Sequence, residues 1–280
     1  MAIEVASRLG AEIISSDSMQ VYRGMDVGTA KPTVIERRGV VHHLIDVADP
    51  EDEFSVADYR RLGRAVIDSA ETPLVITGGS GLHFRALVDP MSFAPTDRAM
   101  RAELEDRSLD EVVAELTGFD PDAGSHVDLG NKRRAVRALE ITRLTGETPS
   151  RRAHSTEAGD LKRYVPDLEF TAVGIDPGSV IDDRIDRRLE EMRSGGLVEE
   201  VSGLASRLGR TARSAVGYRE ILDHLTGETS LDEAFASIGR STRKLARKQR
   251  TWFQRDPRIR WIPWIEDESK RVERVMEVFA

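Results

Sequence analysis

The chain has 280 residues, of which 39% are apolar and 32% charged, and its formal net charge is −8. This composition is typical of a soluble globular protein and argues against one that coats nucleic acid without specificity. The absence of cysteine excludes disulfides, thiolate catalysis and cysteine-based zinc sites. No run of about 18 apolar residues is present, which excludes a membrane span. The opening residues have an early acid and no basic segment, which predicts no signal peptide and a cytoplasmic location.

Short apolar segments bounded by turn residues alternate with helical patterns along the chain. We expect buried strands at residues 11–15, 43–46, 73–77 and 170–175. Helices that separate such strands imply crossover connections and a mostly parallel sheet. Capping boxes predict the starts of four helices, with N-caps at Ser55, Ser108, Ser179 and Ser230.

The chain is expected to form two parts. Residues 96–165 contain no convincing strand, so we interpret them as a helical insertion domain that contacts a nucleic acid. Residues 1–95 and 166–280 are expected to form an α/β catalytic core with C-terminal helices. One of those helices, from about residue 230 to 255, is long and basic.

The most informative segment starts at Asp17, which directly follows the first apolar strand. Ligands of open parallel sheets bind beyond the carboxyl ends of the strands. A carboxylate there can act as a general base or a magnesium ligand, although it can also simply cap the next element. Glycines predict a tightly turned loop as far as Pro32. We interpret Tyr22, Arg23 and Lys31 in that loop as a stacking ring and two cations for a ligand.

Residues 17–32, DSMQVYRGMDVGTAKP, resemble nearly position by position the signature of the tRNA dimethylallyltransferases. Further segments resemble blocks of the same family in the same order, at 42–46, 54–60, 77–84, 131–140, 215–220 and 248–253. Ser80 stands where the family has threonine, and His83 where it has tyrosine. The resemblance covers nearly the whole chain. It implies a P-loop NTPase-like α/β fold, with a parallel sheet flanked by helices and a helical insertion domain.

The resemblance also implies an activity: transfer of a dimethylallyl group from dimethylallyl diphosphate to N6 of the adenine at position 37 of tRNAs that read codons beginning with U. It implies Mg²⁺ as cofactor, the tRNA anticodon stem-loop as partner, and a monomer. The implied catalytic residues are Asp17, as the base, and Arg188, which would bind the leaving diphosphate together with Arg184. The implied tRNA contacts are Asp17, Ser18, Met19, Gln20, Ser80, Arg101, Arg133, Arg134, Arg137, Arg243, Arg247 and Lys248.

Two groups of cations have a plainer alternative. Arg184 and Arg188 lie four residues apart among aspartates, a pattern typical of a solvated helix face with ion pairs. Residues 240–255 carry seven cations and no acid. A charge run is usually a solvated face, but the accompanying Trp252 and Phe253 favour a helix that faces RNA.

The glycine-rich turn at residues 78–81 also has two interpretations. Its glycines let backbone amides approach an anion or a nucleic-acid backbone, yet many strand-to-helix turns are glycine-rich for steric reasons alone.

The sequence departs from the family in lacking a phosphate-binding loop of the type Gly-x-x-x-x-Gly-Lys-Ser/Thr. We expect that the natural chain starts upstream and includes this loop. The alternative is a truncated remnant that is inactive or only binds tRNA. The rival functions are a P-loop kinase of small metabolites and an RNA-binding module.

Overall fold

The computed structural model describes residues 1–279, which divide into two compact units. The first unit joins Met1–Leu87 to the chain from Glu169 onward, and the second is Val88–Leu168. The sequence placed the helical insertion at 96–165, and the second compact unit is longer than this at both ends.

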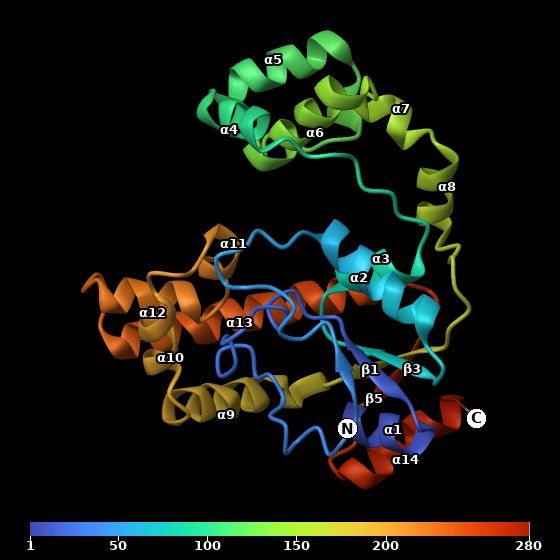
Figure 1. The fold of residues 1–280 in the computed structure, drawn as a ribbon, viewed down its shortest axis with the longest axis vertical. Coiled ribbons are helices and arrows are strands. Elements are labelled where there is room, and N and C mark those ends of the chain that lie inside the picture. The colour runs from blue at the N-terminus through green and yellow to red at the C-terminus, as the bar shows by residue number, and fades with distance from the viewer. Residues whose placement is uncertain (280) are drawn as a thin grey trace. The chain divides into compact units, whose positions relative to one another are not determined.

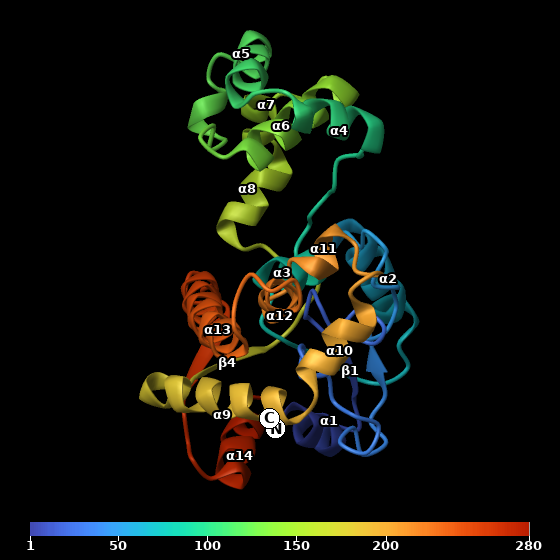
Figure 2. The same ribbon diagram turned by 90° about the vertical axis from the view of Figure 1, so that its left-hand side faces the viewer.

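Within residues 1–279, the first unit contains five strands and most of the helices. Figures 1 and 2 show the course of these elements through the unit. Its elements are, in chain order, α1 (Ala2–Leu9), β1 (Glu12–Ser15), β2 (His42–His43), α2 (Val56–Ser69), β3 (Leu74–Thr77), α3 (Gly81–Val88), β4 (Ala172–Asp176), the 3-10 turn η2 (Gly178–Val180), α9 (Ile181–Ser194), α10 (Leu197–Leu204), α11 (Arg210–Arg213), α12 (Tyr218–Leu225), α13 (Leu231–Phe253), β5 (Ile259–Pro263) and α14 (Glu268–Phe279). All its strand pairs are parallel, which confirms the predicted α/β class.

The strands form two sheets, one ordered β2-β1-β3 and the other β4-β5. The central strand β1 buries Ile13, which packs with Ala6 of α1 and Val75 of β3. Because β1 and β3 are parallel and in register from Glu12 to Ser15, their carboxyl ends lie side by side. The segments that follow these two strands therefore start at the same edge of the sheet.

The predicted strand at 43–46 is wrong beyond His43. Leu44 and Asp46 have positive φ values, 60° and 56°, which an extended strand cannot contain. The strand β5 was not predicted, because a basic helix and a proline obscured its short alternating pattern of apolar residues.

Three of the four predicted helix starts are confirmed: Ser55, Ser108 and Ser230 each form a capping box. The fourth is wrong. Ser179 lies inside η2, and α9 begins only after Val180, which provides no side-chain cap. A turn that already continues into a helix removes the need for a separate cap.

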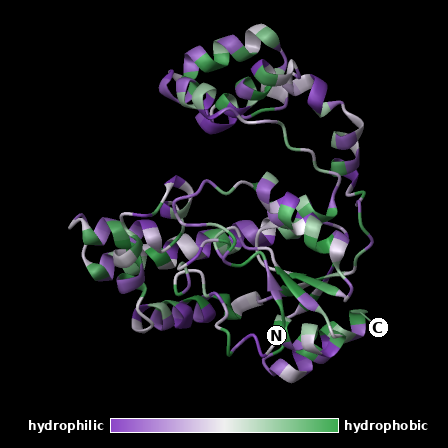
Figure 3. Cartoon of the chain, in the orientation of Figure 1, coloured by the Kyte–Doolittle hydropathy of each residue, from purple (hydrophilic) through white to green (hydrophobic). Residues whose placement is uncertain are grey.

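The second unit is helical throughout its regular structure. Its elements are α4 (Arg98–Asp106), α5 (Leu109–Phe119), the 3-10 turn η1 (Ala123–Ser125), α6 (Lys132–Thr145), α7 (Pro149–Ala153) and α8 (Thr156–Arg163). Leu104, Val112, Leu116 and Leu139 form the centre of its own hydrophobic core. Its helices carry both hydrophilic and hydrophobic residues along their length, as amphipathic helices do (Figure 3). Across residues 1–279, no helix has the length and apolar character needed to cross a membrane.

Candidate active site

Asp17 lies just beyond the carboxyl end of β1, and its side chain shapes the turn that follows. Its Oδ1 atom accepts hydrogen bonds from the backbone N–H groups of Met19, at 2.8 Å, and Gln20, at 3.4 Å. Aspartate commonly stabilises turns in this way, by binding the backbone two residues ahead. The alternative that Asp17 only caps the next element therefore accounts for Oδ1 but not for Oδ2. Among the described residues, Oδ2 accepts no hydrogen bond. The carboxylate is fixed in direction and keeps one oxygen for another partner.

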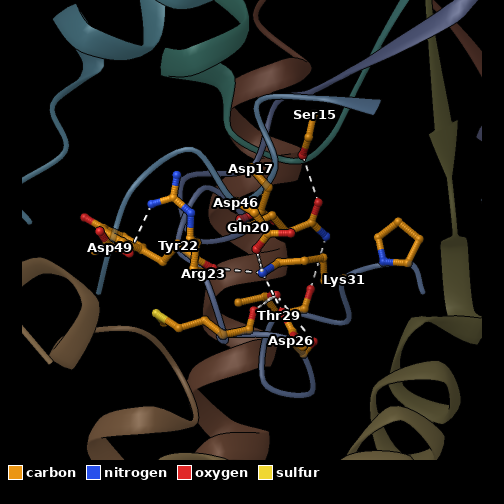
Figure 4. A network of polar contacts seen from close by, with 12 residues as sticks. Ser15, Asp17, Gln20, Tyr22, Arg23, Asp26, Thr29, Lys31, Asp46 and Asp49 are labelled. Carbon is orange, nitrogen blue, oxygen red and sulfur yellow. Dashed lines mark hydrogen bonds and ion pairs between the residues drawn. The ribbon is translucent and has the colours of Figure 1, made fainter. Parts of the chain in front are cut away.

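Lys31 supports the loop from inside (Figure 4). Its Nζ atom lies 2.5 Å from Asp26 Oδ1 and 2.6 Å from Asp46 Oδ1, and it donates to the Tyr22 carbonyl at 2.8 Å. The side chain is only 3% exposed, and Tyr22 is fully buried. The predicted use of Tyr22 and Lys31 as a stacking ring and a cation for a ligand is wrong, because the fold encloses both of them.

The residues that follow Asp17 differ in whether their side chains are hydrogen-bonded within the protein. The Gln20 amide accepts from Ser15 Oγ at 2.8 Å and donates to the Thr29 carbonyl at 3.3 Å. It therefore joins the sheet to the far side of the loop. Ser18 and Met19 are half-buried, and no side-chain hydrogen bond is present at Ser18 in residues 1–279.

A carboxylate from a distant helix holds the tip of the loop. Glu200 of α10 accepts from three consecutive backbone N–H groups, those of Asp26, Val27 and Gly28, at 2.7–3.0 Å. It also accepts from the Tyr218 hydroxyl at 2.5 Å. Burial, together with this carboxylate, raises the pKa of Tyr218, so its proton stays in place.

This clamp was missed from the sequence, although Gly28 was a signal for it. A Cβ atom at Gly28 would lie 2.4 Å from the Tyr218 ring. Glycine is therefore required there so that the loop can approach α12 closely.

In the glycine-rich turn after β3, other atoms of the protein occupy the space that side chains would need. Cβ atoms at Gly78, Gly79 and Gly81 would lie 2.3, 2.3 and 2.0 Å from Ser16, Gln249 and Trp252 respectively. The steric interpretation of these glycines accounts for all three. The turn is also tied to residue 16, because Ser80 N–H donates to the Ser16 carbonyl at 3.1 Å and Ser16 Oγ donates to the Ser80 carbonyl at 3.2 Å.

The structure brings together the two residues expected to catalyse the reaction. Arg188 lies on α9 as an exposed residue, but protein surrounds its guanidinium closely. Burial lowers the pKa of Arg188, and the charge of Asp17 acts in the opposite direction. The two side chains are therefore close enough to interact electrostatically. Arg184, one helical turn earlier, lies over the Trp264 ring with its Cζ atom 4.4 Å from the ring centroid.

Some cations of the basic helix α13 form ion pairs with the protein, and others are exposed to solvent. Arg243 pairs with Asp182 at 2.8 Å and Asp186 at 2.6 Å, both on α9, and Arg250 pairs with Asp176 at 2.7 Å. The prediction that no acid balances these cations is therefore wrong for two of them. Four others form what we call the exposed face of α13: Arg240, Lys244, Arg247 and Lys248.

The predicted cations of the second unit also fall into two groups. Arg101 and Arg137 both pair with the buried Glu140, at 2.5 and 2.7 Å. Burial raises the pKa of Glu140, but hydrogen bonds from these guanidinium groups outweigh it and lower the pKa overall. In contrast, Arg133 and Arg134 are exposed at the start of α6, and Arg134 pairs with Asp128 at 3.3 Å.

A metal site built from protein groups alone is absent from residues 1–279, because no three His, Asp or Glu side chains gather closely enough to hold an ion. Magnesium commonly takes only one or two carboxylates and completes its shell with water and substrate phosphates. The described residues thus offer part of a magnesium shell at most.

Comparison with known protein families matches the chain to the model described as IPP transferase, over residues 20–256. The chain is 41% identical to the tRNA dimethylallyltransferase of Bifidobacterium longum, covering 100% of this chain and 86% of that protein. It is 42% identical to the tRNA dimethylallyltransferase of Moorella thermoacetica, covering 100% of this chain and 89% of that protein.

Several solved structures are similar over 99% of the chain, and two of them illustrate the likeness. The tRNA isopentenylpyrophosphate transferase of Bacillus halodurans superposes with a TM-score of 0.71 at 33% identity and is covered to 90% of its length. A eukaryotic dimethylallyltransferase acting on tRNA superposes with a TM-score of 0.78 and is covered to 75%. At 22% identity, the second likeness concerns the fold alone.

Proposed function

Since the chain belongs to the IPP transferase family, we propose that it transfers a dimethylallyl group from dimethylallyl diphosphate to N6 of the adenine at position 37 of tRNAs that read codons beginning with U. The observation that carries this proposal is the placement of Asp17. Its carboxylate stands at the carboxyl end of the central strand, is held by two backbone N–H groups, and lies within electrostatic reach of Arg188.

Asp17 would act as the base. The lone pair of the exocyclic N6 is delocalised into the purine ring, so N6 becomes a competent nucleophile only as its proton leaves. N6 attacks the allylic carbon, the bond between that carbon and the diphosphate oxygen breaks, and the diphosphate departs with the electron pair. The N6 proton goes to Asp17 Oδ2, the oxygen that the turn leaves without a partner. The adenine must leave the anticodon stack to reach this position.

Arg188 would neutralise the leaving diphosphate. A guanidinium suits this role because its planar fork binds two phosphate oxygens at once. The exposure of Arg188 supports the assignment, since a diphosphate must reach the group from solvent. Arg184 would contribute a second cation from the same helix while stacked on Trp264. We assign Mg²⁺ to the bound diphosphate, which supplies the phosphate oxygens that the described residues lack.

The tRNA would contact exposed cations of both units. Arg247 and Lys248 of α13 and Arg133 and Arg134 of α6 are accessible to a phosphate backbone. Arg101, Arg137 and Arg243 are engaged by carboxylates of the chain. We therefore propose that these three shape the tRNA surface through the fold and make at most a secondary contact with tRNA.

The test is prenyl transfer from labelled dimethylallyl diphosphate to tRNA by the wild-type chain and an Asp17→Asn variant. Asparagine keeps an oxygen for the Met19 N–H but cannot accept the N6 proton. We expect the rate to fall by a factor on the order of 10²–10⁴, with tRNA affinity nearly unchanged. Asp49→Asn is the matched control, because that carboxylate is exposed and pairs with Arg23. Equal rates for Asp17→Asn and wild type would remove Asp17 from its role, and tRNA binding without any transfer would favour an RNA-binding module.

A further inference from the structure

His83 and Ser80 form a hydrogen-bonded pair beside the proposed base. The Ser80 hydroxyl oxygen lies 2.7 Å from His83 Nδ1. Both backbone hydrogen-bonding groups of Ser80 are bound to Ser16, the residue that precedes Asp17. The turn that carries the Ser80 hydroxyl is therefore fixed next to the start of the loop that carries Asp17.

The surroundings hold this pair in place. The edge of the Tyr59 ring meets His83, with centroids 4.5 Å apart and planes at 76°. The Tyr59 hydroxyl in turn donates to the Ser15 carbonyl at 2.9 Å. On the other side, Trp252 of α13 packs against Gly81, the residue that starts the helix carrying His83. These contacts restrict the His83 ring and the turn that carries Ser80.

The direction of the hydrogen bond depends on the proton of Nδ1. When Nδ1 is unprotonated, the single proton of the Ser80 hydroxyl is donated to it, and Ser80 can only accept from a ligand. When Nδ1 carries a proton, the ring donates to the Ser80 oxygen and the hydroxyl proton is released. Ser80 can then donate to a phosphate or carbonyl oxygen of RNA, an acceptor that it could not bind before.

We propose that His83 is a positioning residue that sets the direction of the Ser80 hydroxyl: the neutral ring can carry its proton on either nitrogen, whereas protonated His83 always donates from Nδ1 and leaves Ser80 to donate a hydrogen bond to the bound tRNA. The proposal rests on the proposed function, because it concerns the nucleotide that Asp17 receives. The proposal predicts that tRNA affinity depends on pH, which the presence of Asp17 and Arg188 alone does not predict.

The charged and titratable groups around His83 fix the pH range. The Asp17 carboxylate faces it from the end of β1 and Tyr59 faces it from α2, while the uncharged Gln249 and Trp252 approach the turn from α13. Burial lowers the pKa of His83 below its ordinary value, and Asp17 opposes that effect. The free protein at neutral pH therefore has a neutral His83. Because protonation favours tRNA, bound tRNA must raise the pKa of His83 by linkage.

The experiment measures the dissociation constant for tRNA between about pH 5.5 and about pH 8. For the wild-type chain we expect affinity to rise by roughly tenfold or more as the pH falls, the gain from one hydrogen bond to a charged acceptor. His83→Asn places an amide that does not titrate near the position of Nδ1, and Ser80→Ala removes the hydroxyl. Both variants should show a flat profile. His42→Asn is the control and should keep the wild-type profile, because burial also lowers the pKa of His42 but its Nδ1 contacts the Val40 carbonyl, just before β2.

Three results would overturn the inference. A wild-type profile that is flat would show that His83 does not control binding, and an unchanged profile in His83→Asn would assign the titration elsewhere. An unchanged profile in Ser80→Ala would mean that the imidazolium charge acts without the hydroxyl. Failure of the wild-type chain to bind tRNA at any pH would instead contradict the proposed function.

Discussion

The loop of residues 17–32 and the exposed face of α13 use charged side chains in opposite ways. In the loop, Lys31 is enclosed between two carboxylates (Figure 4). Glu200 binds three backbone N–H groups of the same loop, so the charges are satisfied by the chain itself. On α13, Arg247 and Lys248 extend into solvent. The loop therefore provides fixed geometry, whereas the helix provides adjustable electrostatic attraction. A substitution in the first should disturb the whole site, and one in the second should remove a single contact.

The largest effect is expected from removing the buried cation of the loop. Lys31→Met leaves the carboxylates of Asp26 and Asp46 facing each other and the Tyr22 carbonyl without its donor. We expect the free energy of unfolding to fall by about 2–3 kcal/mol, less than for a fully buried pair because both carboxylates reach solvent. Urea unfolding monitored by tryptophan fluorescence measures the change.

Arg23→Met is the matched control for this variant. Arg23 belongs to the same loop and pairs with Asp49 at 3.0 Å, but both side chains are about half exposed. An exposed pair of this kind contributes less than about 1 kcal/mol. Equal losses of stability in the two variants would contradict the contrast between an enclosed and an exposed charge.

A smaller effect is expected where α13 meets the glycine-rich turn. A Cβ atom at Gly81 would lie 2.0 Å from the Trp252 ring, so Gly81→Ala must displace the indole. Overpacking of this kind costs about 1–3 kcal/mol, and fluorescence of the displaced Trp252 should change as well. Gly118→Ala is the control. Nothing lies within 4 Å of a Cβ atom there, so helix propensity alone should stabilise α5, by about 0.5–1 kcal/mol. Similar outcomes at the two glycines would show that α13 does not press on the turn.

The smallest effect is expected on the exposed face of α13. Arg247→Ala should leave stability unchanged and weaken tRNA binding a fewfold at low salt. Its signature is the salt dependence, because losing one phosphate contact reduces the slope of log affinity against log salt by about 0.7–0.9. Lys270→Ala, which removes an exposed cation from α14, should keep the wild-type slope. An unchanged slope in Arg247→Ala would place the tRNA elsewhere.

The parts of the fold that local sequence determines were predictable. The apolar residues before Asp17 formed β1 as expected, because a buried strand needs only a short apolar run. Ser230 began the basic helix, because a capping box acts within four residues. The position of Asp17 at the sheet edge follows from these local features combined with the rule for parallel sheets.

The remainder depended on partners distant in sequence. Arg243 was counted as a free cation because its aspartates lie on α9, 57 and 61 residues away. Lys31 was assigned to a ligand because no local pattern shows that Asp46 reaches it. In both cases the tertiary fold determines whether a cation faces a carboxylate or water, and sequence spacing along one helix or loop contains no such information.

The Glu200 clamp has a consequence for biosynthesis. The N–H groups that it binds at Asp26, Val27 and Gly28 precede it by 172–174 residues. At typical translation speeds of about 5–20 residues per second, the ribosome makes the loop roughly 10–30 s before the residue that fixes it. During that interval the three amides are hydrated by water and the loop has no defined end. The segment carrying Asp17 is thus synthesised well before α10 and acquires its final shape only after α10 has been made.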